Sequence, residues 1–316
     1  MVENKWKYTA LTASIVYLCL SLGVHAQSLS GSASERVEKL ENPAKEAVLT
    51  VPVVPTPQTE GLLKVHFLDV GHGDACLIQC PDGENILIDA GSGEYSYFVT
   101  DYLRNAGVKE LDMVIATHPH SDHVGGLSAV INEFPVKLVL DPGKAHTTGS
   151  YRQFLEAVKA HPDTEYKIGR AGQQYTFGKV KLSILHPGNR LPRKINNCSI
   201  VSRLEYDKIS FLFAGDAEKE AEEQILRRGY RPKSTVLKVG HHGSTTSTTK
   251  PFLRAVSPRV AVISTGPSPP GYDKRAEIVD RLEKRGVKVY RTDKDGTIKI
   301  ESNGKNCTIK RVKKRG

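Results

Sequence analysis

The chain has 316 residues, which gives room for one large domain or two small ones. Its formal net charge is +10, so it either binds polyanions or is simply a soluble basic protein. The five cysteines form no CxxC motif, which argues against a thiolate zinc site. After residue 26, no segment is apolar over the roughly 20 residues that a membrane-spanning helix needs.

Residues 1–26 have the layout of a signal peptide. "MVENKWKY" carries two lysines, the apolar run "TALTASIVYLCLSLGV" follows, and cleavage is expected after Ala26. The alternative is an uncleaved segment that anchors the protein in the membrane. In both cases the sequence predicts export, to the periplasm or the outside of the cell.

Residues 27–60 are rich in Ser, Glu and Pro and end in "VPVVPTPQTE", which predicts an exposed linker. Residues 61–316 contain 40 Lys and Arg against 29 Asp and Glu, a net charge of +11. The positive charge therefore belongs to a folded domain, expected over 61–302, and to a basic C-terminal tail, 303–316. Such a surface favours polyanionic partners, such as DNA or other nucleic acid, teichoic acid or an anionic membrane.

Short apolar runs alternate with turn signals from residue 62 onward. They predict adjacent antiparallel strands over 62–70, 75–80 and 85–91. Further strands are expected over 111–117, 136–141, 175–185, 198–206, 208–216, 235–240 and 259–265, with two more closing the domain. Helices are expected over 95–106, 123–132, 150–160, 217–228, 249–256 and 273–285. This interleaving predicts one α/β domain of two packed sheets with helices on their outer sides.

Polar side chains cluster directly after buried-looking strands. Asp89 closes one strand, Asp216 closes another, and histidines follow two more. Strands that end on a common edge bring such loops together. Imidazole and carboxylate together suit Zn²⁺, Mn²⁺ or Fe rather than Ca²⁺ or Mg²⁺.

The densest cluster is the loop "THPHSDHVGG". In an extended segment His118 and His120 project to the same side, while Asp122 and His123 begin the next helix. Two glycines then remove side-chain bulk where that helix packs close behind the loop. The alternative is a helix capped by Asp122 or its neighbouring serine, with the histidines merely exposed.

The cysteines permit few disulfides. Cys76 and Cys80 lie on one expected strand about 13 Å apart, at about 3.3 Å per residue. That exceeds the roughly 7 Å that a disulfide spans between Cα atoms. Cys198 and Cys307 remain as candidate disulfide partners.

The motifs "THPHSDHVGG", "LIDAG", "LFAGD" and "LKVGHHGS" resemble those of the metallo-β-lactamase-fold hydrolases. The fuller set "FLDVGHGDACLI", "NNCSIVSRL", "HHGSTTST" and "YRTDKDGTIKI" is similar to the ComEC-like branch, whose domain follows a membrane channel for DNA uptake. The resemblance covers about residues 62–301. It implies a four-layer αββα sandwich with up to two divalent ions, Zn²⁺ or Mn²⁺, at one edge.

Carried over by position, the resemblance implies a complete ligand set. The first ion would be bound by His118 and His120, and the second by Asp122, His123 and His241. Asp216 would bridge the two ions. Asp89 would orient the histidine loop by hydrogen bonds.

Two positions depart from the family pattern. Asn196 and Asn197 stand where a third histidine for the first ion is usual, so that site would be loose, Mn²⁺-preferring or empty. His186 is an alternative ligand, although its place before a proline favours a structural role. His72 replaces a common glutamine and either contacts substrate or hydrogen-bonds within its turn.

His242 has no implied metal role. Beside "GSTTSTT" it either touches a phosphate and protonates a leaving group, or lies in an ordinary helix-capping segment. His242 and Asp122 are the expected catalytic residues.

Three functions follow from these patterns. The first is an exported phosphodiesterase or nuclease that uses a metal-activated hydroxide. The second is a hydrolase of lactams, lactones or other acyl compounds on the same fold. The third is a non-catalytic binder of polyanions.

Overall fold

A computed structural model describes residues 61–269 and 271–312. The expected signal peptide (1–26), the linker (27–60) and the last four residues of the tail lie outside these described residues. Within them, no helix combines the length and the apolar character required to cross a membrane.

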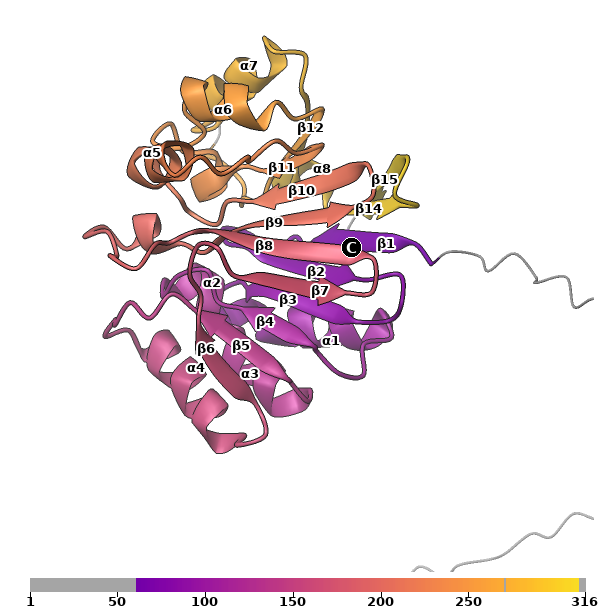
Figure 1. Cartoon of the computed structure of the whole chain (residues 1–316), viewed down its shortest axis with the longest axis vertical. Coiled ribbons are helices and arrows are strands. Elements are labelled where there is room, and N and C mark those ends of the chain that lie inside the picture. Colours follow the sequence, from indigo (N-terminus) through magenta and orange to yellow (C-terminus); the bar gives the residue numbers. More distant parts are fainter. Residues whose placement is uncertain (1–60, 270, 313–316) are drawn as a thin grey trace, which may run out of the picture. The chain divides into compact units, whose positions relative to one another are not determined.

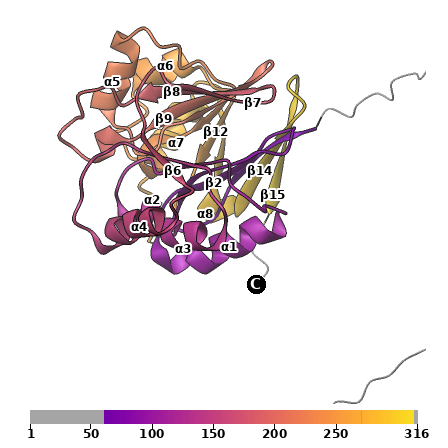
Figure 2. The same ribbon diagram turned by 60° about the horizontal axis from the view of Figure 1, so that its bottom comes forward.

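Two β-sheets face one another, and helices cover the outer face of each (Figures 1 and 2). The larger sheet has the strand order β15-β14-β1-β2-β3-β4-β5-β6. Its strands are β1 (Leu63–Phe67), β2 (Ala75–Gln79), β3 (Asn85–Ala90), β4 (Met113–Ile115), β5 (Leu138–Asp141), β6 (Glu165–Ile168), β14 (Thr297–Ser302) and β15 (Cys307–Val312). In this sheet β15 to β3 are antiparallel, and β3 to β6 run parallel.

The smaller sheet has the order β13-β12-β11-β10-β9-β8-β7. Its strands are β7 (Gln174–Phe177), β8 (Val180–His186), β9 (Val201–Tyr206), β10 (Ile209–Phe213), β11 (Val236–Lys238), β12 (Val260–Ile263) and β13 (Lys288–Arg291). Strands β7 to β10 are antiparallel, whereas β10 to β13 are parallel.

The longer helices form the outer layers. Those beside the larger sheet are α1 (Ser96–Asn105), α3 (Leu127–Glu133) and α4 (Gly149–Ala160), and those beside the smaller sheet are α5 (Lys219–Arg227), α6 (Lys250–Val256) and α7 (Ala276–Glu283). Single turns complete the set: α2 (Ser121–Val124), α8 (Thr292–Asp295), η1 (Gly93–Tyr95), η2 (Asn196–Cys198) and η3 (Gly240–Gly243). The predicted αββα sandwich is therefore confirmed.

Three apolar cores hold the four layers together. Phe67, Phe211 and Phe213 belong to the core between the sheets, and separate cores lie under the helices on each side. In α4 the buried residues Tyr151, Phe154, Ala157 and Val158 recur every three or four positions, so one face of the helix packs inward. Each large apolar side chain so buried contributes about 1.5–3 kcal/mol.

Strands β6 and β15 were not predicted from the sequence. All four β6 side chains are exposed, and every side chain on β15 is exposed or half-buried. The apolar alternation in these edge strands is short and weak, because β6 has four residues and only Cys307 and Ile309 of β15 pack against the core between the sheets. Backbone pairing with β5 and β14 makes them strands. Part of the expected basic tail is thus a strand of the larger sheet.

The described cysteines are free thiols, so Cys198 and Cys307 do not pair. The Cys198 Sγ instead contacts the carbonyl oxygens of Pro192 (3.3 Å) and Lys194 (3.4 Å).

The parallel strands place the polar loops. The carboxyl ends of β3 and β4 in one sheet, and of β10 and β11 in the other, open onto the same edge of the sandwich. Residues from both sheets meet there.

Candidate metal centre

The histidine loop lies between β4 and α2. The His118 Nε2 in this loop lies 3.0 Å from the His120 Nδ1. It also lies 3.7 Å from the Asp216 Oδ2, which belongs to the loop after β10. The glycines behind the loop allow α2 to approach β3, because a Cβ on Gly126 would collide with the Ala90 carbonyl. The predicted helix over 123–132 accordingly divides into α2 and α3 at these glycines.

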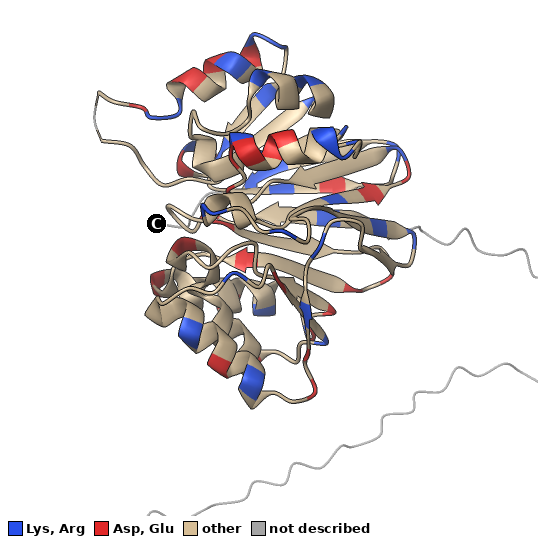
Figure 3. Ribbon diagram, turned by 60° about the vertical axis from the view of Figure 1, so that its left-hand side comes forward, with Lys and Arg blue, Asp and Glu red and all other residues tan. Residues whose placement is uncertain are grey.

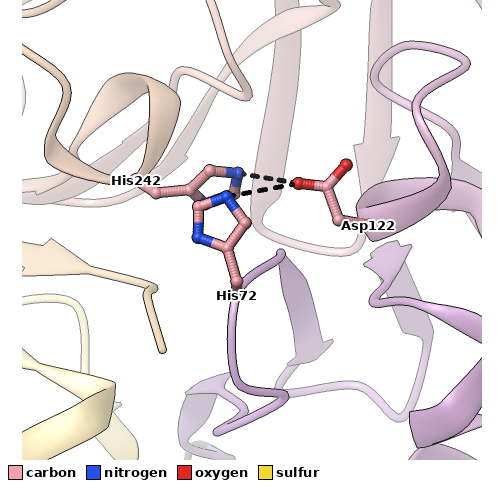
Figure 4. A group of neighbouring side chains, drawn as sticks. All are labelled: His72, Asp122 and His242. Atoms are coloured by element: carbon pink, nitrogen blue, oxygen red, sulfur yellow. Dashed lines mark ion pairs between the residues drawn. The ribbon is translucent and has the colours of Figure 1, made fainter. Parts of the chain in front are cut away.

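A second group of ligand atoms lies on the other side of Asp216. The His123 Nε2 is 3.3 Å from the Asp216 Oδ1 and 3.3 Å from the His242 Nε2. The His242 Nε2 is in turn 3.3 Å from the Asp122 Oδ2 (Figure 4) and 3.5 Å from the Asp216 Oδ1. These atoms come from three separate loops.

The spacing of these atoms fits divalent ions. Four ligands about 2.0–2.2 Å from a tetrahedral zinc ion lie roughly 3.3–3.6 Å from one another, and the distances above cluster around that range. The Asp216 Oδ1 is buried without a hydrogen-bond donor among the described residues. Paired imidazole nitrogens that face each other likewise direct lone pairs at a common point. One divalent ion on each side of Asp216 would be coordinated by the Asp216 carboxylate and by these imidazole nitrogens.

The charge of the centre also favours cations. Burial acts to lower the pKa of His242, but Asp216, Asp122 and Asp74 outweigh it and raise this pKa to about 9. Burial acts to raise the pKa of Asp216, yet His242 and His123 hold it well below its usual range. In His118, by contrast, burial and the neighbouring His123 lower the pKa, which leaves a neutral ring available as a ligand. Clustered carboxylates therefore attract positive charge here.

The two adjacent histidines of η3 are placed differently from the expectation. His242, not His241, lies with Asp122 and His123, while the His241 Nε2 is 3.9 Å from the Asp216 Oδ2, the oxygen nearest His118. Both residues have left-handed backbone conformations, with φ of 47° and 50°. This turn directs the 3% exposed His242 inward, whereas the His241 side chain is 29% exposed.

Asp89 lies behind the histidine loop at the end of β3. Its carboxylate accepts hydrogen bonds from the Thr117 N–H (2.8 Å) and hydroxyl (2.7 Å), and lies 2.8 Å from the His123 Nδ1. Such contacts hold both the loop backbone and the ring of His123 in place.

Sequence reasoning missed Asp74 and Lys238. Both side chains are buried, and they form an ion pair behind the centre. The Asp74 Oδ1 also lies 3.3 Å from the His242 Nδ1, which sits 3.0 Å from the Ser264 carbonyl oxygen. The only sequence signal was their place inside two of the family motifs, Asp74 in "FLDVGHGDACLI" and Lys238 in "LKVGHHGS".

The asparagines that replace the usual histidine have separate places. The Asn197 Oδ1 accepts hydrogen bonds from the backbone N–H groups of Glu218 (3.0 Å) and Ala221 (3.3 Å), so it caps the start of α5. The Asn196 amide lies 3.2 Å from the His241 Nε2, at the rim of the centre. His186 is buried away from the clusters, with its Nδ1 3.0 Å from the Ser199 carbonyl oxygen.

His72 is exposed at the mouth of the centre. Its Nε2 is 3.8 Å from the Asp122 Oδ2 (Figure 4), and its ring lies 4.4 Å from that of His242. Burial and the charge on His242 lower the pKa of His72. His72 therefore faces the ligands rather than its own turn.

The fold and the His/Asp clusters define a hydrolase of the metallo-β-lactamase type. The model of the Metallo-beta-lactamase superfamily matches residues 68–266, and the chain belongs to this superfamily. The YhfI protein of Bacillus subtilis shares the fold, with a TM-score of 0.52 at 14% identity over 76% of this chain and 100% of that one.

Curated relatives confirm the ComEC-like resemblance. ComE operon protein 3 of Bacillus subtilis is 28% identical over 78% of this chain and 34% of its own length. Recombination protein 2 of Haemophilus influenzae is 33% identical over 75% of this chain and 28% of its own length. Competence protein ComA of Neisseria gonorrhoeae is also similar, at 29% identity. The chain spans about a third of the length of these relatives.

Proposed function

We propose that the protein is a metal-dependent phosphodiesterase that cleaves nucleic acid. The observation that carries this proposal is the Asp216 carboxylate, flanked by one ligand group on each side. Two bound divalent ions would supply a nucleophile from water at neutral pH and neutralise charge on a phosphate. The competence-related names of the relatives support DNA as the polymer.

The surroundings of the centre favour a polyanion over a small acyl compound. A pocket of about 610 Å³ lies between α5 and the loop before η2, and Arg190, Arg193, Arg227 and Arg228 are among its lining residues. That loop leads directly into Asn196 at the rim of the centre. Lys and Arg also lie on both halves of the molecule (Figure 3). Binding through such residues weakens steeply as salt rises.

Each side chain of the centre has a proposed part. His118, His120 and His241 would hold one ion, with Asp216 shared between the two. Asp122, His123 and His242 would hold the other, so His242 is a ligand in this proposal rather than a proton donor. His72 is the group at the mouth that can touch the phosphate or the leaving group, because its ring is exposed beside Asp122.

A metal-by-substrate matrix tests this function. Protein loaded with Zn²⁺ or Mn²⁺ is assayed on DNA, RNA, bis(p-nitrophenyl) phosphate and nitrocefin. We expect phosphodiester cleavage that the double change His118→Ala and His120→Ala abolishes while circular dichroism stays unchanged. Cleavage of nitrocefin alone would favour an acyl hydrolase, and a metal content near zero after reconstitution would favour a non-catalytic binder.

Export is part of the proposal and rests on residues 1–26 of the sequence alone. Expression of the full chain in a bacterial host, followed by fractionation and N-terminal sequencing, tests it. A new terminus after Ala26 in the exported fraction supports cleavage. Full-length chain in the membrane fraction supports anchoring, and full-length chain in the cytosol contradicts export.

A further inference from the structure

Beside the metal centre lies a pocket of about 350 Å³ that combines basic, aromatic and hydroxyl groups. His72 and His242 form its inner side, and Ser244 and Thr245 line it as well. Its outer side belongs to the loop between β12 and α7, described over residues 264–269 and 271–275. The described lining residues include Lys274 and Arg275 and no carboxylate.

Two side chains of this loop stand out at the pocket. Tyr272 is 63% exposed, and Lys274 is exposed two residues further on. Both line the same pocket as His72, which lies 3.8 Å from a proposed metal ligand, Asp122. Proteins bind single-stranded nucleic acid with this combination of an exposed aromatic ring and a neighbouring cation, because bases stack on the ring while phosphates pair with the positive charge.

The base of the loop is held firmly, which gives these side chains a defined place. Arg275 is 6% exposed, and its guanidinium donates to the Gly266 carbonyl (2.8 Å) and to the hydroxyls of Thr265 and Ser268. Asp273 accepts from the Arg275 N–H (3.0 Å) and pairs with Arg291. Arg275 is therefore a buried anchor, and Lys274 is the cation that faces a ligand.

We propose that this pocket binds the nucleotide next to the scissile phosphate, with Tyr272 stacked on its base and Lys274 paired with its outer phosphate. The inference rests on the proposed nuclease function and adds a site of substrate recognition to it. Stacking on one aromatic ring changes affinity by about 10-fold or more and tolerates every base. The pocket thus selects single-stranded over fully paired nucleic acid.

The ratio of two activities tests the stacking. The first activity is kcat/KM on a single-stranded oligonucleotide, and the second is kcat/KM on bis(p-nitrophenyl) phosphate. We expect Tyr272→Ala to lower the ratio of the first to the second by about 10-fold or more, mainly because KM for the oligonucleotide rises. Tyr272→Trp should restore the ratio. Tyr97→Ala is the matched control, because Tyr97 is 77% exposed on α1 and should leave the ratio unchanged.

An abasic scan adds a readout that a purely structural role would not move. Wild-type cleavage should fall when one particular nucleotide beside the cut lacks its base, and Tyr272→Ala should be insensitive to that loss. Lys274→Ala should reduce the slope of log affinity against log salt by about 1, whereas Lys284→Ala at the end of α7 should not.

The outcomes distinguish a failure of the stacking site from a failure of the proposed nuclease function. A wild-type protein that cleaves the oligonucleotide, with a ratio that Tyr272→Ala leaves intact, overturns the stacking site alone. A metal-loaded wild-type protein that neither cleaves nor binds oligonucleotides overturns the nuclease function and this site with it.

Discussion

Lys238 at the end of β11 and Asp74 just before β2 form a buried ion pair that joins the two sheets behind the metal centre. Burial acts to raise the pKa of Asp74, but the Lys238 ammonium and the His242 ring lower it overall. The Asp74 carboxylate therefore stays ionised. The ion pair connects the smaller sheet to the loop that supports His242.

Removal of either partner alone should destabilise the fold. Asp74→Asn leaves the Lys238 ammonium buried without its counter-ion, and such losses cost about 3–5 kcal/mol. The double change Asp74→Asn and Lys238→Met should recover part of this, because no buried charge remains. Urea unfolding compares the wild type with these two variants. Asp280→Asn is the control, since the Asp280–Lys284 pair is exposed and contributes at most about 1 kcal/mol. Equal losses at Asp74 and Asp280 would refute the role of burial.

The two η3 histidines should serve different ions. A metal titration of the wild-type protein is expected to show two binding phases. Combining His118→Ala with His241→Ala should remove one phase, because both rings lie near the Asp216 Oδ2. Combining His118→Ala with His242→Ala should remove both. If the double variant His118→Ala and His242→Ala retains one metal-binding phase, the two histidines do not bind different ions.

Asp89→Asn should weaken metal binding without touching a ligand. The carboxylate positions Thr117 and the His123 ring, and loss of such outer contacts lowers metal affinity about 10–100-fold. Isothermal titration with Zn²⁺ or Mn²⁺ measures the effect. Asp112→Asn at the opposite end of β4, where the Asp112 Oδ2 accepts from the Asn85 N–H, is the matched control. An Asp89 variant with wild-type affinity would rule out the positioning role.

His66 should make the fold less stable in acid. Burial, with smaller effects from Lys299 and Lys64, lowers the pKa of His66 from 6.5 to about 4, so between these values the unfolded chain binds the proton and the folded one does not. The free energy of unfolding therefore falls as pH drops from about 6.5 toward 4, by up to about 3 kcal/mol.

His66→Gln should flatten this slope, while it can still meet the Tyr102 hydroxyl, which lies 2.8 Å from the His66 Nδ1. Urea unfolding at several pH values compares the two proteins. Identical slopes in variant and wild type would show that His66 does not titrate as its burial predicts.

The layers and most elements could be predicted from the sequence, because apolar periodicity records which face of each strand or helix is buried. The helices α1 and α4 lie within one residue of their predicted ends. The histidine loop was also visible, since its ligands are close in the chain. The edge strands β6 and β15 were not predicted, because β6 is fully exposed and β15 packs only two half-buried residues, Cys307 and Ile309, against the core.

Other features depend on contacts between distant segments, which no local pattern encodes. The left-handed turn at η3 determines that His242 points inward and His241 toward the rim, although the two are neighbours in sequence. Packing of β11 against the loop before β2 pairs Lys238 with Asp74 across 164 positions. Residue types and their order thus predict which chemistry is present. Which side chains come within 4 Å of one another depends on the backbone direction and packing of loops from both sheets, and only the tertiary structure determines that.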